Sequence, residues 1–129
     1  MKIQDITEKF GNLKIFEKRC INEEYAEIVF FTEQLDHCSK ILEDFLGPAV
    51  KPPGLEPSKN HKKVADVFGG ILFNQTLFQK DYDDIIIIAM FWPWQNGKQV
   101  TLKIAHQGKN SDGRIVESII DSKDRYFGP

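Results

Sequence analysis

The residues best suited to chemistry lie on either side of a predicted hairpin, and their types favour binding over catalysis. Met90, Trp92 and Trp94 alternate on the first strand, and Thr101 and Lys103 alternate on the second. Indole rings combine a large apolar surface with one N–H donor, and the threonine and lysine add polar contacts. Such a mixed surface is typical of a ligand pocket or a protein interface. We therefore predict that these residues bind a small molecule or a partner protein.

Asn74 and Gln75 add polar groups to the same candidate site. They interrupt the otherwise apolar segment Ile71 to Gln79, which we interpret as a third strand. Polar groups inside a sheet need hydrogen-bond partners. Asn74 and Gln75 either satisfy neighbouring backbone or face the cavity beside Trp92 and Trp94, in which case they belong to the ligand-binding residues.

Three lysines form a second candidate site, at the start of a short helix predicted from Lys59 to Phe68. Ser58 is suited to cap this helix, and Lys59, Lys62 and Lys63 follow in its first turns. Backbone amides at a helix N-terminus, together with lysines, can hold an anion such as phosphate or carboxylate. The alternative is a solvated basic face, because no glycine-rich phosphate loop precedes the helix.

Signatures of common enzymes are absent from the sequence, which has no GxSxG, HExxH, Walker or GxGxxG motif. Cys20 and His106 would form a nucleophile and its base only if their strands were adjacent. His37 falls on the polar side of a predicted helix, where a solvated surface residue is expected. We therefore assign no catalytic residue, metal ligand or cofactor, and leave open whether the protein is an enzyme.

An uninterrupted apolar run, Ile85 to Trp92, is the strongest structural signal in the chain. It is too short to span a membrane, and it lacks the polar spacing of a surface helix. A strand that is exposed on one side alternates apolar and polar residues, whereas this run is apolar on both faces. The run therefore predicts a central strand that is covered above and below.

The pair Asn96-Gly97 predicts a hairpin after this strand. A type I′ turn over the pair would place Gln95 opposite Lys98 and fix the register of both strands. Pro93 lacks an amide proton, so a bulge that shifts the register by one residue is the alternative. The turn predicts three cross-strand pairs on one nearly apolar face: Phe91 with Leu102, Ala89 with Ile104, and Ile87 with His106.

Further elements are predicted before and after this hairpin. An edge strand is expected at Asn12 to Cys20, a second strand at Tyr25 to Phe31, and a helix at Glu33 to Leu46 capped by Thr32. One long helix from Asn22 to Leu46 is the alternative to the second strand. Prolines stiffen the connection between residues 48 and 57, which forms either a packed strap or a rigid lid. Arg114 to Asp121 fits a strand or a helix, of which we choose the strand.

Length and charge exclude several classes of protein. The chain has 129 residues, which predicts a single domain that is able to form its own core. A net charge of −2 provides no basic field for nucleic acid, and no segment is long and apolar enough for a membrane span. Residues 1–9 contain no apolar region typical of a secretion signal, so we predict a cytoplasmic protein. Cys20 and Cys38 lack a CxxC spacing and are expected to be reduced thiols.

One segment resembles the opening of a glyoxalase-type, or vicinal oxygen chelate, module. Ile28 to Leu35, followed by a helix that ends in Phe45-Leu46-Gly47, is similar to the strand, helix and Leu-Gly of that family. The likeness covers about twenty residues, and the second half of the chain has no repeated strand-helix unit. The family's metal-binding histidine and glutamate positions are not matched here. The resemblance implies a small lyase or isomerase as an alternative function.

The sequence as a whole predicts an α+β domain over residues 1–129, with a mostly antiparallel sheet of five to six strands and two helices on one face. Two helices cover only one face, yet the central strand is apolar on both. The second face then needs a cover, which a small ligand, a partner chain or the proline-rich connection could supply. We therefore predict a ligand-binding or protein-interaction module that uses the tryptophan face and forms a homodimer.

Overall fold

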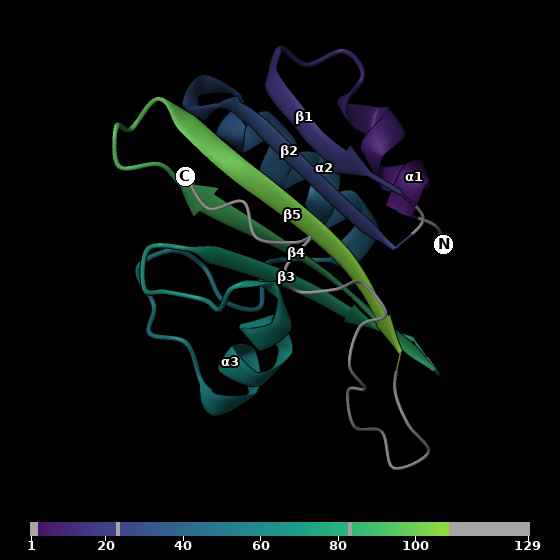
Figure 1. Cartoon of the computed structure of the whole chain (residues 1–129). Helices are drawn as coiled ribbons and strands as arrows, with labels where there is room; N and C mark the ends of the chain where they lie inside the picture. The colour runs from purple at the N-terminus through teal and green to yellow at the C-terminus, as the bar shows by residue number, and fades with distance from the viewer. Residues whose placement is uncertain (1–2, 23, 83, 109–129) are drawn as a thin grey trace.

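The fold is α+β, as predicted, and a computed structural model describes residues 3–22, 24–82 and 84–108 (Figure 1). The longer elements in chain order are α1 (Ile3–Thr7), β1 (Ile15–Ile21), β2 (Tyr25–Phe31), α2 (Leu35–Leu46), α3 (Lys59–Ala65), β3 (Thr76–Asp81), β4 (Ile85–Pro93) and β5 (Gln99–Gly108). Single 3-10 turns follow α1, precede α2 and follow α3: η1 (Glu8–Phe10), η2 (Thr32–Gln34) and η3 (Asp66–Phe68).

The described strands form one antiparallel sheet in the order β1-β2-β5-β4-β3. The predicted strand at Tyr25–Phe31 is therefore confirmed, and the alternative of one long helix is wrong. β1 lies at an edge of the sheet, as predicted, and its pairing with β2 contains two irregularities. The strand that we predicted at residues 114–121 lies outside the described residues.

The register of the β4–β5 hairpin agrees with the prediction, although the turn type does not. Phe91 pairs with Leu102, and Pro93 pairs with Val100 without a bulge. Within the turn only Gly97 has a positive φ, of 73°, so Asn96 does not take part in a type I′ turn. The Asn96 side chain instead accepts a hydrogen bond from the Lys98 amide at 2.8 Å. The observed turn still joins β4 and β5 at the positions that we predicted for a type I′ turn, so the register of the two strands is the predicted one.

One face of the sheet is covered by α1 and α2 and holds an apolar core. Phe91 lies at its centre, with the rings of Phe30 and Phe78 edge-on at 5.7 and 5.6 Å. The helix predicted at Glu33 to Leu46 is present as α2, and its Cys38 and Leu42 are fully buried in this core. Thr32 does not cap it as predicted, because Thr32 begins the preceding η2 and the N-cap position of α2 is Gln34. The start of the chain also contributes to this core. Its buried side chains are Ile3, Ile6 and Phe10.

The other face is covered by α3, whereas we had expected both predicted helices on one side (Figure 1). Val64, Ala65 and Phe68 pack there against Ile88 and Met90, which are 1% and 0% exposed. The apolar part of this face is thus closed within one chain. The main reason for predicting a second subunit over this face was its uncovered apolar surface, and that surface is covered by α3.

The proline-rich connection explains how the two helices reach opposite faces. It leaves α2 on one side and runs past the edge strand β3, where Lys51 forms an isolated antiparallel bridge with Leu77. The backbone amides of Val50 and Lys51 donate to the Leu77 carbonyl at 2.9 and 3.2 Å. The segment is therefore a packed strap along β3, which is one of the two forms that we had considered for it.

Candidate functional site

A pocket of about 330 Å³ opens between the end of α3 and the loop that leads into β3. Trp92 of β4 contributes a side of this pocket. The lining residues are Lys62, Asp66, Gly69, Gly70, Ile71, Leu72, Gln75 and Trp92. Three of them, Trp92, Gln75 and Lys62, were predicted from separate parts of the sequence and are now found at one site.

Capping interactions at both ends of the α3 segment set the position of its pocket side chains. At its start, the Ser58 hydroxyl accepts from the His61 amide, and His61 Nδ1 accepts from the Ser58 amide, both at 3.1 Å. The predicted cap is therefore confirmed, and it is a reciprocal capping box. At the other end Gly69 is left-handed with φ of 105°, and the Gly70 amide donates to the Ala65 carbonyl at 2.9 Å. This reversal brings the two glycines into the pocket wall.

Gly69 is required by space as well as by conformation. A Cβ atom at this position would lie 2.4 Å from Cη2 of Trp92, well inside van der Waals contact. A positive φ is also unfavourable for a residue that carries a Cβ. The backbone of Gly69 therefore packs directly on the edge of the indole ring and holds the ring in place.

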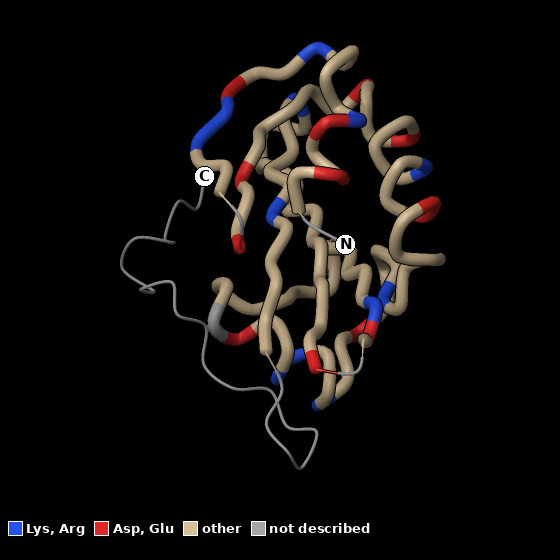
Figure 2. Tube along the Cα trace, turned by 90° about the vertical axis from the view of Figure 1, so that its right-hand side faces the viewer, with Lys and Arg blue, Asp and Glu red and all other residues tan. Residues whose placement is uncertain are grey.

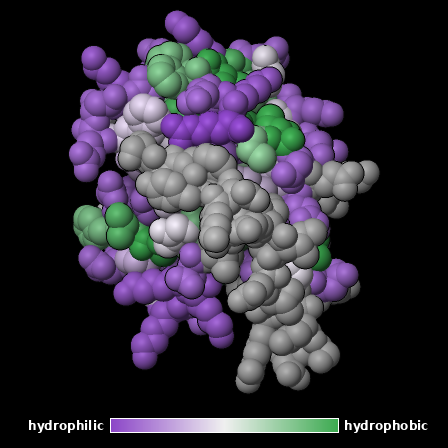
Figure 3. Space-filling view, viewed as in Figure 1, coloured by the Kyte–Doolittle hydropathy of each residue, from purple (hydrophilic) through white to green (hydrophobic). Residues whose placement is uncertain are grey.

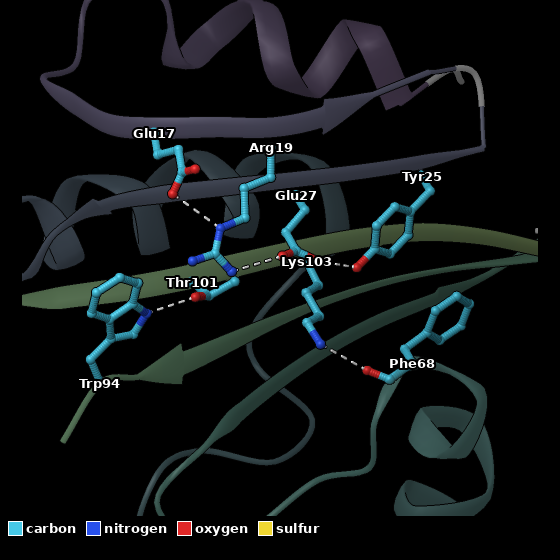
Figure 4. Close-up of polar contacts among 8 residues, drawn as sticks. All are labelled: Glu17, Arg19, Tyr25, Glu27, Phe68, Trp94, Thr101 and Lys103. Atoms are coloured by element: carbon cyan, nitrogen blue, oxygen red, sulfur yellow. Dashed lines mark hydrogen bonds and ion pairs between the residues drawn. The ribbon is translucent and has the colours of Figure 1, made fainter. Parts of the chain in front are cut away.

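Lys103 fixes the same indole ring from the sheet. Its Nζ lies 3.4 Å from the centroid of the Trp92 ring, a close cation–π contact. The same Nζ donates to the carbonyl of Phe68 at 3.1 Å (Figure 4). Burial lowers the pKa of Lys103 to about 8, while Glu27 opposes this shift and Arg19 adds to it. The lysine thus ties β5 to the end of the helix that forms the pocket wall.

The loop in front of β3 is held by polar contacts that the sequence did not suggest. Gln75 Oε1 accepts from the Leu72 amide at 2.7 Å, so this carboxamide braces the loop that carries Leu72. Lys51 is fully buried, and its Nζ donates to the carbonyls of Pro52, Phe73 and Gln75. Burial lowers the pKa of Lys51, and Glu56 opposes the shift. The strap and the loop are therefore fastened to each other behind the pocket.

A buried polar network lies beside the pocket on the same face of the sheet (Figure 4). Glu27 is fully buried, accepts from Tyr25 Oη at 2.5 Å, and forms an ion pair with Arg19 at 3.2 Å. Arg19 also pairs with the exposed Glu17 at 3.2 Å. Our sequence analysis missed this network, although an isolated glutamate within the apolar strand Tyr25–Phe31 was a signal for it.

The structure divides the predicted ligand-binding residues into three groups. Trp92 and Gln75 line the pocket. Three others are buried by interactions within the chain: Met90 in the core beneath α3, Lys103 against Trp92, and Thr101, whose hydroxyl accepts from Trp94 Nε1 at 2.8 Å. Asn74 and Trp94 lie outside the pocket lining, Asn74 exposed in a loop and Trp94 half-buried. The strand predicted from Ile71 begins only at Thr76, so Asn74 and Gln75 precede β3 instead of interrupting it. The predicted face is therefore mostly a packed interior with a pocket at one end.

The predicted anion-binding lysines lie on the solvent side of α3. Lys59, Lys62 and Lys63 are all exposed, and only Lys62 of these lines the pocket described here. Acidic and basic residues are interspersed along the described trace (Figure 2). The amide of His61 in the first turn is already used by Ser58.

The sheet order separates Cys20 from His106. Cys20 is on β1 and His106 is on β5, with β2 between them, so the condition for a nucleophile and base pair is not met. Both cysteines are free thiols. Burial and the Glu27 carboxylate raise the pKa of Cys20, and burial raises the pKa of Cys38 to about 12. Residues 3–22, 24–82 and 84–108 contain no group of three or more side chains arranged to hold a metal ion.

Comparison of the chain with models of protein families, with curated proteins and with solved structures gives no match. Among the described residues, no helix has the length and apolar character needed to cross a membrane. The pocket and its surroundings are therefore the only basis for a proposed function.

Proposed function

We propose that the chain is a binding module without catalytic activity, and that it takes a small molecule into the pocket beside Trp92. The observation that carries the proposal is the convergence of Trp92, Gln75 and Lys62 on one pocket. Its volume of about 330 Å³ falls at the lower end of the range for small-molecule sites. A single large aromatic surface with a few polar groups is the usual composition of such a site.

The walls of the pocket are rigid before any ligand binds. Gly69 and Lys103 hold the Trp92 ring from two sides, and Gln75 braces the loop that carries Leu72. Preorganisation of this kind lowers the ordering cost of binding. The ring also has an Nε1 donor that is buried and has no hydrogen-bond partner.

A fragment screen with matched variants tests this function. Ligand-observed NMR should detect small apolar and polar fragments that bind the wild-type protein. Leu72→Asp places a charge on the pocket wall and should reduce binding, because an apolar contact is lost and a carboxylate must be desolvated. Phe73→Asp is the control, since Phe73 is similarly exposed but does not line the pocket. Absence of any binding fragment, or equal losses in both variants, would contradict the proposal.

A protein interface is the second candidate, and it is favoured by exposed apolar side chains beside the pocket. The described chain has six large hydrophobic residues that are exposed, and four of them lie on the strap and the loop before β3: Val50, Leu55, Leu72 and Phe73. Green patches appear over this region in the lower left of the molecule (Figure 3). A hydrogen bond from the Gly54 amide to the Phe73 carbonyl at 2.9 Å joins the two segments.

The predicted homodimer would form through this exposed apolar surface, because α3 covers the sheet face on which we first placed it. Sedimentation equilibrium of the wild-type protein and of a Leu72→Ser, Phe73→Ser double variant would measure it. A dimer in the wild type that dissociates in the variant supports the interface. A monomer in both excludes a homodimer and leaves the small-molecule function as the proposal. The glyoxalase-type alternative gains no support from the described residues, which offer no metal-binding group.

A further inference from the structure

Two opposite charges lie on the helical side of the pocket. Lys62 and Asp66 both line it, and they are four residues apart on the α3–η3 segment. Residues at this spacing are neighbours on one side of a helix and commonly form an ion pair. Among the described residues, neither Lys62 nor Asp66 forms an ion pair or a side-chain hydrogen bond with another residue. Both charged groups are therefore free to pair with a ligand.

The pocket lining also includes apolar residues. These are Ile71, Leu72 and Trp92, and Ile71 is 5% exposed, so its position is fixed by packing. A volume of about 330 Å³ corresponds to roughly eleven water-sized groups at about 30 Å³ each. A ligand of this size has room for two charged groups and one branched apolar group.

Resting on the ligand-binding function proposed above, we infer that the ligand is a small zwitterion with an apolar side group, of the chemical class of the apolar α-amino acids. Its carboxylate pairs with the Lys62 ammonium, and its ammonium pairs with the Asp66 carboxylate. Its side group packs on Ile71 and Leu72. A ligand with one charge would satisfy one of these residues and place its charge close to a like charge on the other.

Three leucine probes that carry different charges test the inference. L-leucine carries both charges, N-acetyl-L-leucine carries the carboxylate alone, and L-leucinamide carries the ammonium alone. Titration is followed by the ¹⁵N-resolved indole signal of Trp92. We expect L-leucine to bind about fivefold more tightly than either analogue, as for one partly exposed ion pair. Equal affinity for the three probes would overturn the inference.

Charge variants locate the interaction on the two residues. Lys62→Gln and Asp66→Asn should each weaken L-leucine binding about fivefold. The exchanged variant, Lys62→Asp with Asp66→Lys, should restore binding because both charges are again present at the pocket. Lys59→Gln is the control, since Lys59 is exposed on the same helix but does not line the pocket. An exchanged variant as weak as the two single variants would contradict the proposed pairing.

Failure of this inference is distinguishable from failure of the proposed function. If none of the three leucine probes binds but other fragments still bind the wild-type pocket, the zwitterion inference is wrong and the binding function stands. If no fragment of any charge binds the folded protein, both are wrong. Circular dichroism of each variant confirms that the fold is retained, because both charged side chains are solvent-exposed.

Discussion

The two faces of the sheet are constructed differently. Beneath α1 and α2 the buried side chains of the sheet are apolar apart from Thr76, and three phenylalanine rings pack edge to face at the centre. Beneath and beside α3 the apolar cluster is smaller, and buried polar groups continue the same surface. These buried polar residues include Glu27, Thr101, Lys103 and Gln107.

This difference separates stability from function within one sheet. Burial of apolar surface is the main stabilising term in a fold, so the α2 side contributes most to stability. Buried charges need partners and add little net stability. The α3 side has such charges, an orphan indole donor and a pocket. We therefore place stability mainly on the first face and binding on the second, and the predictions below test this division.

The largest effect is expected at the centre of the α2 side. Phe91→Ala removes the ring that contacts Phe30 and Phe78 and leaves a cavity, so the free energy of unfolding should fall by about 3–5 kcal/mol. Urea denaturation monitored by circular dichroism measures the loss. Phe91→Leu should cost less because it fills much of the volume. A loss below about 1 kcal/mol for Phe91→Ala would show that this face is not the main source of stability.

The next effect concerns the glycine that contacts the pocket tryptophan. Gly69→Ala should lower the free energy of unfolding by about 1–3 kcal/mol, because it combines a strained φ with a clash on Trp92. Gly70→Ala is the matched control, since its φ is also positive, at 92°, but no atom lies within 4 Å of the added Cβ. Thermal denaturation of both variants gives the difference. Equal losses would contradict a tight contact between Gly69 and the indole ring.

A smaller effect is expected from the buried glutamate of the polar network. Glu27→Gln leaves Arg19 without its buried partner, and we expect a loss of about 2 kcal/mol in the free energy of unfolding. Glu17→Gln is the control, because Glu17 pairs with the same arginine but is 50% exposed. An exposed pair contributes at most about 1 kcal/mol. Equal effects in the two variants would show that burial does not determine the strength of this network.

The smallest effect is a pH dependence that arises from Lys103. Its pKa of about 8 in the folded chain is below the ordinary lysine value of 10.5, so the unfolded chain binds more protons above pH 8. Stability from this group therefore rises with pH, by about 1 kcal/mol between about pH 7 and about pH 9. Lys103→Met should abolish the rise, and the difference between the two proteins isolates it from Cys38 and other groups. Parallel pH profiles would contradict the prediction.

Local signals in the sequence predicted much of the sheet. The Asn96-Gly97 pair gave the register of β4 and β5 correctly, because strand positions opposite a short turn are fixed by its length. β1 was correctly placed at an edge, and Ser58 was correctly identified as a cap. These features depend on residues that are neighbours in the sequence.

The placement of α3 and the contacts of Lys51 could not be predicted in the same way. Both depend on the path of the strap along β3, which joins residues far apart in the sequence. The same applies to the pocket, since Lys62, Gln75 and Trp92 come together only when α3 crosses the face. The residues themselves were identified, but the site was predicted as an open sheet face and is instead a pocket at its end.

The most direct test of the binding site compares the two tryptophans of the chain during a ligand titration. Trp94 Nε1 donates to Thr101, whereas Trp92 Nε1 has no partner and its ring lines the pocket. With ¹⁵N-labelled protein, a pocket ligand should shift the indole signal of Trp92 and leave that of Trp94 nearly unchanged. Equal shifts of both signals, or a shift of Trp94 alone, would contradict a ligand site beside Trp92.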